Sequence, residues 1–472
     1  MIKFIRSFFS FGLATTIDKL IIFLLLPIYT RLFTTAEYGV IDLIQMSMGV
    51  VAIFGQLQLE SSLQRYYYQF KGNLKKIFIS TIFIAVTCLS VIVCILIIAF
   101  SKQVSLLLFD EPGYSNLIEL ASLQLPLTNF TMIALVVLRY EKENLKFFLI
   151  VLLRVILSLC VVLYLVVYLE MGLEGIFLAG VISFFLSSIP FFFILKRFFS
   201  KTFSIRLLRK AFGYGLPQFP ARIGSVLLTY ANRFFMIGVL SVSSIGIYSL
   251  SLKLASSMQL VYSAFIMAWS PFMFKQLRSS AHLQLFPKAL VLSSIPAFFL
   301  ICSLCLFAKE IVLFIASQEF YESYRYIGGL SLFYVLLIFK EIVDIGPKLK
   351  EKTKYLSLTF FCALLVNLIS LYLLIHAFLL EGVVIAMVLT NTFLLAMSWF
   401  VSNRLHPIPY NVPLFIITAI PAYILSVGML FFEISLFTRI LLFIFLGLVY
   451  GWGFVATFGK QRVKRLVLKS RG

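Results

Sequence analysis

Charged side chains are scarce in this sequence. Only 12% of the 472 residues are Asp, Glu, Lys or Arg, whereas 61% are hydrophobic, and the mean hydropathy is +1.04. A soluble protein carries about 25% charged residues. The composition therefore excludes an ordinary soluble domain and predicts a polytopic membrane protein.

Sequence signals for catalysis, cofactors and nucleic acid are also missing. No G-x-x-x-x-G-K-[ST] segment is present, so no built-in ATPase is predicted. The three histidines are scattered, and the six cysteines all lie in apolar runs; Cys302 and Cys305 have redox-motif spacing, but their span holds no ligand partners. The net charge of +21 is spread over short loops rather than gathered on a soluble domain. We therefore expect no enzyme, no metal, no cofactor and no nucleic-acid partner.

Apolar runs long enough to cross a bilayer recur along the whole chain. They are continuous rather than alternating, which predicts helices and not strands. We expect an all-α fold of about fourteen transmembrane helices, over residues 8–33, 39–63, 77–100, 117–138, 147–169, 172–195, 211–240, 246–272, 287–308, 324–346, 355–378, 382–402, 411–432 and 436–458.

Lysine and arginine are concentrated in alternate loops. The loops of the opposite side hold only Arg31, Lys102, Lys309 and Arg439, and they lean acidic. By the positive-inside rule the basic side, with both termini, is cytoplasmic. Because the alternation holds across the spans, it supports the helix assignment independently of hydropathy.

Short segments repeat at separations of 203 or 207 positions: Leu173–Ile176 as Leu380–Val383, Tyr38–Val40 as Ile245–Ile247, and Phe11–Leu13 as Tyr214–Leu216. Six spans separate the copies, so they point the same way, and a cavity is expected between two halves related by a pseudo-twofold along the membrane normal. We predict an N-lobe of six helices over 1–197, a cytoplasmic linker over 198–210, a C-lobe of six helices over 211–403, two further helices over 411–458 and a basic cytoplasmic tail over 459–472.

The span 211–240 carries two arginines, Arg222 and Arg233. A lipid-facing arginine at mid-membrane costs about 3 kcal/mol on insertion scales, so this face is expected to turn toward a polar cavity. Ser225, Thr229 and Asn232 lie on the same face at helical spacing. The alternative is an arginine held in a structural ion pair.

Other polar residues within spans extend this prediction. The repeat places Lys19 opposite Arg222, a pair of cations suited to a phosphate-rich anion. Asp18 is expected to line the same cavity and to neutralise one of the two cations when the site is empty; the alternative is a permanent bridge from Asp18 to Arg222. Lys253 lies at the same depth as Arg233, and snorkelling to the interface is the alternative for both. The second span carries a polar stripe, and the fourth adds uncharged groups suited either to sugar hydroxyls or to packing hydrogen bonds. The expected cavity-lining residues of these two spans are Asp42, Gln45, Gln56, Glu60, Gln124 and Thr128.

Several segments resemble the signature of bacterial oligosaccharide flippases, which export O-antigen or capsule repeat units and belong to the multidrug/oligosaccharidyl-lipid/polysaccharide exporter superfamily. They are Leu26-Pro27-Ile28-Tyr29-Thr30-Arg31-Leu32, Glu37-Tyr38-Gly39, Gly215-Leu216-Pro217, Asn232-Arg233-Phe234-Phe235, Gly246-Ile247-Tyr248-Ser249 with Lys253, and Trp269-Ser270-Pro271-Phe272. The chain departs from the pattern at Asn232, where many relatives have Asp. Arg233 therefore lacks its usual neighbouring carboxylate.

The resemblance implies a two-lobed transporter of the bacterial inner membrane that works by alternating access through a basic central cavity. It would carry an undecaprenyl-pyrophosphate-linked oligosaccharide to the periplasmic leaflet, with Lys19, Arg222, Arg233 and Lys253 as anion contacts. Membrane lipids, a polysaccharide polymerase and a chain-length regulator are the partners it suggests. The alternatives are a drug/cation antiporter of the same superfamily and a peptidoglycan-precursor flippase; a polysaccharide polymerase or ligase fits less well, because no outer loop is long enough for a catalytic domain.

Overall fold

The computed structural model describes residues 25–469 except 142, 277–281, 351 and 353. Every regular element in this part of the chain is a helix, which confirms the all-α prediction. The chain divides into two compact units, each of which is described by itself. Unit 1 holds residues 1–237 and 241–246, and unit 2 holds 238–240 and 247–472.

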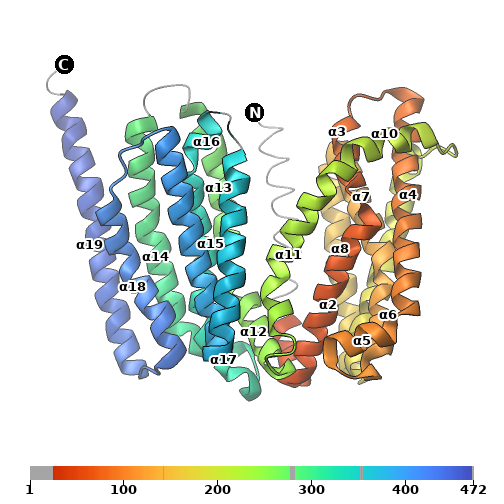
Figure 1. The fold of residues 1–472 in the computed structure, drawn as a ribbon, viewed down its shortest axis with the longest axis horizontal. Coiled ribbons are helices and arrows are strands. Elements are labelled where there is room, and N and C mark those ends of the chain that lie inside the picture. Colours follow the sequence, from red (N-terminus) through yellow and green to blue (C-terminus); the bar gives the residue numbers. More distant parts are fainter. Residues whose placement is uncertain (1–24, 142, 277–281, 351, 353, 470–472) are drawn as a thin grey trace. The chain divides into compact units, whose positions relative to one another are not determined.

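Unit 1 is a bundle of long helices joined by short ones (Figure 1). Its elements are α2 (Thr35–Gln56), α3 (Leu59–Tyr66), α4 (Gly72–Ala99), α5 (Ser101–Phe109), η1 (Pro112–Tyr114), α6 (Ser115–Ser122), α7 (Gln124–Tyr140), α8 (Asn144–Val162), η2 (Leu163–Tyr168), α9 (Gly172–Leu195), η3 (Lys196–Phe198), α10 (Ile205–Gly215), η4 (Leu216–Gln218) and α11 (Phe219–Met236).

Unit 2 is a second helical bundle, and α12 begins in unit 1 and continues into it. Its elements are α12 (Val242–Ala255), α13 (Met258–Gln276), α14 (His282–Ile315), η5 (Gln318–Ser323), α15 (Tyr324–Val343), α16 (Ile345–Leu349), α17 (Lys354–Leu405), α18 (Val412–Phe431) and α19 (Leu436–Lys469). The long α17 is two helices that meet at Leu379, whose backbone is non-helical.

Ten helices of the described part are long and apolar enough to cross a membrane, which confirms a multi-pass membrane protein. One of them, Tyr355–Leu405, contains two of the expected spans. The expected spans 211–240 and 246–272 coincide with α10–α11 and α12–α13 but are not among the ten. The helix α11 is short and carries two arginines, and α12 ends at Ala255. Most of the expected span 8–33 lies outside the described residues.

The expected second span, 39–63, is broken into two helices. Leu57 and Gln58 both adopt left-handed backbone conformations, with φ of 42° and 59°, and they end α2 at Gln56. Such a conformation is unfavourable for residues other than glycine and is held by the surrounding structure. Glu60 therefore belongs to α3 and does not continue the polar face of α2.

Helix α11 packs antiparallel along α2 within unit 1. The rings of Phe54 and Phe219 lie 5.4 Å apart near one end. Toward the other end, a Cβ atom at Gly49 would lie 3.0 Å from the hydroxyl of Tyr230. The compact unit thus includes a span that the sequence repeat assigned to the C-lobe. The division into lobes stays a prediction.

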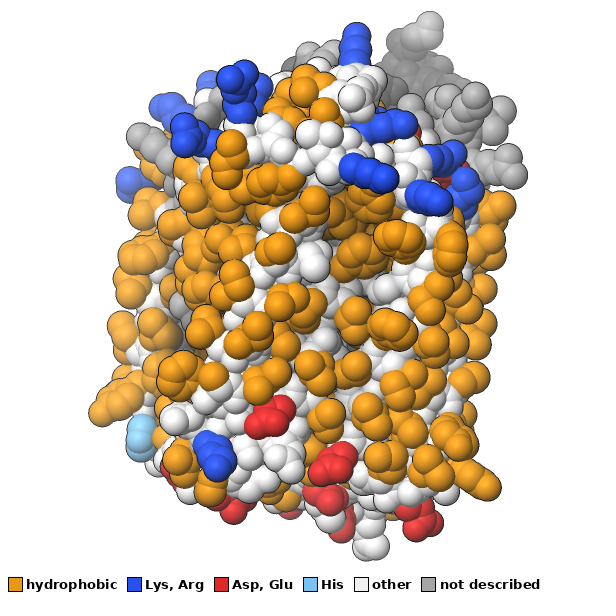
Figure 2. Space-filling model, turned by 90° about the vertical axis from the view of Figure 1, so that its right-hand side faces the viewer, with side chains coloured by type: hydrophobic (Ala, Val, Ile, Leu, Met, Phe, Trp, Pro, Cys, Tyr) orange, Lys and Arg blue, Asp and Glu red, His pale blue; other side chains and the backbone are white. Residues whose placement is uncertain are grey.

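The outer surface of unit 1 is a broad hydrophobic band with opposite charges at its two ends. Figure 2 shows lysine and arginine gathered at one end and acidic side chains at the other. Exposed basic residues include Lys71, Lys196 and Arg206, and exposed acidic residues include Asp110 and Glu170. Such a band is the surface expected of a protein that is solvated by lipid.

Two glycines of the repeated motif meet where α2 and α12 begin. A Cβ atom at Gly246 would lie 1.9 Å from the carbonyl oxygen of Thr35 and 3.1 Å from the backbone nitrogen of Gly39. A Cβ atom at Gly39 would lie 2.2 Å from the carbonyl oxygen of Val242. Because backbone atoms occupy the space of both missing side chains, only glycine permits this approach.

A histidine pair joins the start of α14 to the residues after α17 in unit 2. The Nε2 atoms of His282 and His406 lie 2.8 Å apart, so one ring donates a hydrogen bond to the other. Burial lowers the pKa of His406, and the charges of His282 and Lys350 lower it further. The pair is therefore stable only while it is not fully protonated.

Replacing Gly246 by alanine is expected to destabilise the fold by about 1–3 kcal/mol, because the added methyl group forces two backbones apart. Thermal unfolding in detergent measures this change. The matched control is Gly428→Ala in α18, where a Cβ atom meets nothing within 4 Å; this change should be neutral or stabilising by up to about 1 kcal/mol. Equal effects of the two substitutions would contradict the close approach.

Unit 2 is expected to lose stability as the pH falls below about 6.5, the ordinary histidine pKa. The folded pKa of His406 lies below its unfolded value, so the stabilisation is present above the unfolded pKa and is lost as acid protonates the pair. His406→Gln should flatten the dependence of the melting temperature on pH in this range. The control is His376→Gln, since His376 is exposed and bonds only its own helix at Tyr372. A slope unchanged by His406→Gln would refute this role.

Candidate functional site

A buried ion pair links α2 to α11 in unit 1. The Nε atom of Arg233 lies 2.6 Å from Oδ2 of Asp42, and its Nη2 atom lies 3.4 Å from Oδ1. The exposed fractions of the two side chains are 9% and 7%. The guanidinium also lies 5.7 Å from the centre of the Tyr230 ring. The two residues predicted separately as a lumen-lining acid and an anion contact are therefore partners.

This pair supplies the carboxylate that the sequence around Arg233 lacks. The neighbouring residue, Asn232, is itself buried and carries no charge. Asp42 lies on another helix and supplies the missing negative charge. A charge inside a low-dielectric interior is tolerated only when it is paired, so the positive charge of Arg233 is already balanced.

A polar cavity of about 350 Å³ lies within unit 1, between α2, α6, α7 and α9. It brings together four residues that the sequence predicted, two from α2 and two from α7, and its lining among the described residues holds no Lys, Arg, Asp or Glu. Its lining residues are Gln45, Met48, Gly49, Ala52, Gln56, Ala121, Gln124, Leu125, Thr128, Asn129, Met132 and Phe177.

Hydrogen bonds tie the polar side chains of this cavity to one another and to the backbone. Gln56 Nε2 donates to Asn129 Oδ1 over 2.6 Å, and Gln124 Nε2 donates to the carbonyl oxygen of Phe177 over 2.9 Å. Thr128 Oγ1 donates to the carbonyl oxygen of Leu125 over 3.0 Å. These bonds hold the lining side chains in one arrangement.

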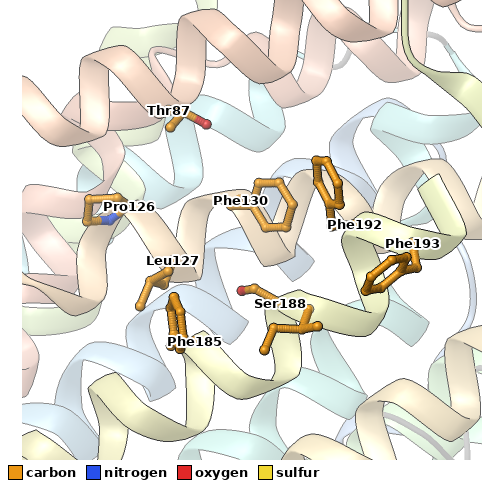
Figure 3. Close-up of a pocket in the computed structure, with 9 residues that line it drawn as sticks. Thr87, Pro126, Leu127, Phe130, Phe185, Ser188, Phe192 and Phe193 are labelled. Atoms are coloured by element: carbon orange, nitrogen blue, oxygen red, sulfur yellow. The ribbon is translucent and has the colours of Figure 1, made fainter. Parts of the chain in front are cut away.

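A second cavity of unit 1, of about 330 Å³, is apolar. Figure 3 shows its aromatic rings, Phe130, Phe185, Phe192 and Phe193. Among the described residues that line it, Thr87 and Ser188 bring the hydroxyl groups. It is lined by a different face of α7, through Pro126, Leu127 and Phe130. Phe192 and Phe193 are largely exposed, as expected for a surface that meets lipid chains. The helix α7 therefore separates a polar cavity from an apolar one.

The remaining predicted residues do not line the polar cavity or lie outside the described residues. The Arg222 side chain is exposed, and Lys253 is half-buried on α12. Glu60 accepts a hydrogen bond from Gln64 and lines neither cavity. Asp18 and Lys19 lie outside the described residues, as do the side chains of Ser225 and Thr229. Their proposed contacts with an anion stay predictions.

Asn129 is the polar residue of the cavity that the sequence analysis missed. It is 2% exposed and contacts Gln56, Ser90 and the carbonyl oxygen of Ala52. An amide in the middle of an apolar span, directly after Thr128, is a signal that could have identified it, because a polar group within a bundle needs partners.

Removing one member of the buried pair is expected to destabilise the protein by about 3–5 kcal/mol, since the other charge is left unpaired. Asp42→Ala and Arg233→Met should each lower the melting temperature, and the double variant Asp42→Leu/Arg233→Met should recover part of the loss. The control Lys146→Ala disrupts the partly exposed pair with Glu143 and should cost less than about 1 kcal/mol. Additive losses in the double variant would contradict the pairing.

Solved structures of membrane transporters share this fold. A structure described as the lipid II flippase MurJ, in an inward closed conformation, matches with a TM-score of 0.70 at 15% identity, covering 97% of this chain and 100% of that chain. An inward-facing multidrug resistance MATE family transporter of the MOP superfamily matches with a TM-score of 0.62 at 15% identity, covering 83% and 94%. A mutant of the Vibrio cholerae MATE transporter VcmN matches with a TM-score of 0.57 at 13% identity, covering 85% and 96%.

No curated protein matches the chain by sequence. A family model does match, over residues 28–325, and its description is polysaccharide biosynthesis protein. The match covers more than half of the chain and spans all the elements of unit 1 that form the polar cavity. It confirms the resemblance read from the sequence motifs: the chain belongs to the polysaccharide biosynthesis protein family.

Proposed function

We propose that this protein is a flippase that moves undecaprenyl-pyrophosphate-linked oligosaccharide repeat units from the cytoplasmic to the periplasmic leaflet of a bacterial inner membrane. The surface polysaccharide made from these units would be O-antigen or capsule. The observation that carries the proposal is that a chain of the polysaccharide biosynthesis protein family has the fold of membrane transporters. A polysaccharide precursor that is built on a lipid must cross the membrane before it is polymerised outside.

The charge pattern supports the direction of transport. Lysine and arginine gather at one end of unit 1 (Figure 2), and the positive-inside rule makes this end cytoplasmic. An anionic diphosphate would approach from that end. Arg222 is the residue that we assign to the diphosphate, with Lys19 as its predicted companion, because the charge of Arg233 is already balanced by Asp42.

The ion pair between Asp42 and Arg233 disfavours a drug/cation antiporter. A cation-binding site needs a carboxylate that is available to the cation, whereas Asp42 lies 2.6 Å from an arginine nitrogen. The polar cavity likewise offers uncharged amides, and its described lining includes no acid. Both observations favour a substrate with many hydroxyl groups.

A peptidoglycan-precursor flippase is the second candidate, because the MurJ structure shares the fold over nearly the whole chain. Complementation separates the two. If the proposal is right, a strain that lacks this protein loses its surface polysaccharide, keeps an intact cell wall, and regains the polysaccharide with the gene; the sugars of the restored glycan then identify the repeat unit. Lysis of the strain and rescue of wall synthesis would instead assign the wall precursor.

Arg222→Ala is expected to abolish surface glycan while the protein still inserts into the membrane, because the anionic head group loses its contact. Arg222→Lys keeps the charge and should retain part of the export. Arg206→Ala removes an equally exposed arginine from α10 and should leave export unchanged. Immunoblotting of membranes and staining of the surface polysaccharide measure both quantities. Normal export by Arg222→Ala refutes the role.

A further inference from the structure

Backbone carbonyls fix the orientation of the amides that line the polar cavity. The Gln124 side chain points one end of its amide at the carbonyl oxygen of Phe177, 2.9 Å away. A carbonyl oxygen can only accept, so this end must be the Nε2 group. Gln124 therefore presents its Oε1 atom with no donor bonded to it among the described residues.

The same reasoning fixes the amide orientation of Gln56, through its neighbour Asn129. Asn129 Nδ2 donates to the carbonyl oxygen of Ala52 and, over 2.8 Å, to Ser90 Oγ. Ser90 in turn donates to the carbonyl oxygen of Gly55. Asn129 must then turn its Oδ1 atom to Gln56, which donates through Nε2 and keeps Oε1 as an acceptor without a donor in this chain of bonds.

The amides fill space beside two glycines, while the hydrogen bonds set which end of each amide is the donor. A Cβ atom at Gly180 would lie 2.6–2.7 Å from the amide atoms of Gln124, and one at Gly55 would lie 2.7 Å from Asn129 Nδ2. The side chains therefore occupy the space that the two glycines leave open. The acceptor orientation is a built property of the cavity and not a choice made by a ligand.

The cavity thus offers hydrogen-bond acceptors without charge. The Thr128 hydroxyl donates its hydrogen to the carbonyl oxygen of Leu125, and its oxygen remains a further acceptor. Gln45 is exposed and brings a further amide from α2. Carbonyl oxygens repel the anionic oxygens of a phosphate, and the described residues that line the cavity include no lysine or arginine to offset this. Groups that donate hydrogen bonds and carry no charge fit it, and the hydroxyls of sugars are such groups.

We infer that this cavity of unit 1 binds the hydroxyl-rich, uncharged glycan part of a lipid-linked substrate and excludes its diphosphate. The inference rests on the proposed function and adds that the glycan and the diphosphate are bound by different residues. The volume of about 350 Å³ lies within the range of ligand cavities, about 300–1,000 Å³. The cavity therefore holds part of an oligosaccharide. It selects the repeat unit by the arrangement of the hydroxyl groups on its sugars.

Equilibrium binding to the full chain in lipid nanodiscs tests the inference with two probes. One is undecaprenyl diphosphate that carries the oligosaccharide of the parent strain, and the other is bare undecaprenyl diphosphate. Gln124→Met and Thr128→Val remove acceptors at nearly constant volume. Each is expected to weaken binding of the glycosylated lipid about tenfold, the loss typical of one or two hydrogen bonds, and to leave binding of the bare lipid unchanged.

Two matched variants control for the lost bonds. Gln218→Met removes a glutamine that also donates to a backbone carbonyl, that of Tyr214, outside the cavity. Thr87→Val makes the same change as Thr128→Val in the apolar cavity of the same unit. Both should bind the two lipids as the unaltered protein does, which shows that the loss belongs to the polar cavity and not to the fold.

The other outcomes separate the inference from the proposed function. If the unaltered protein binds both lipids equally, or if the cavity variants weaken both to the same extent, the cavity does not read the glycan and the inference is overturned while the flippase stands. If the unaltered protein binds neither lipid, the proposed function itself fails, and the inference fails with it.

Discussion

A charge buried in the interior of a helix bundle must have a partner, and this constraint organises the described structure. Its three buried cations, Arg233, Lys340 and Arg439, each have a side-chain nitrogen within 2.8 Å of a carboxylate oxygen. Each pair also joins or ends a helix: Arg233 ties α11 to α2, Lys340 and Asp344 end α15, and Arg439 ties α19 to Glu310 of α14. Buried ion pairs add little net stability, but leaving one charge alone is costly. They therefore select one helix arrangement over others.

The same constraint shapes the candidate binding cavity. The amide nitrogens of its glutamines donate hydrogen bonds, Gln124 to the carbonyl oxygen of Phe177 and Gln56 to Asn129 Oδ1, and no donor among the described residues bonds their Oε1 atoms. In our proposal this cavity, whose described lining holds no charged residue, accepts neutral donors and disfavours an anion. Charge and hydroxyl recognition are then carried by different residues, which suits a substrate made of a diphosphate and a glycan.

Much of this arrangement could be predicted from the sequence, and the reasons for the rest are physical. Hydropathy predicted the helices, and the polar residues of the second and fourth spans predicted four side chains of the polar cavity. The pairing of Asp42 with Arg233 was not predicted, because 191 positions separate the two residues and sequence spacing on one helix says nothing of another. The break at Leu57 and Gln58 was also missed, since neither is a glycine and packing imposes their backbone conformation. Asn129 was overlooked although its polar side chain within an apolar span marked it.

The central claim, transport of a lipid-linked oligosaccharide, is tested most directly by reconstituting the purified protein in vesicles that carry such a lipid in both leaflets. An impermeant glycosidase added outside reports which molecules are exposed. The account predicts that vesicles with the protein expose the inner-leaflet pool as well, whereas empty vesicles expose only the outer one. Identical cleavage in both kinds of vesicle, with the protein shown to be folded, would contradict the account.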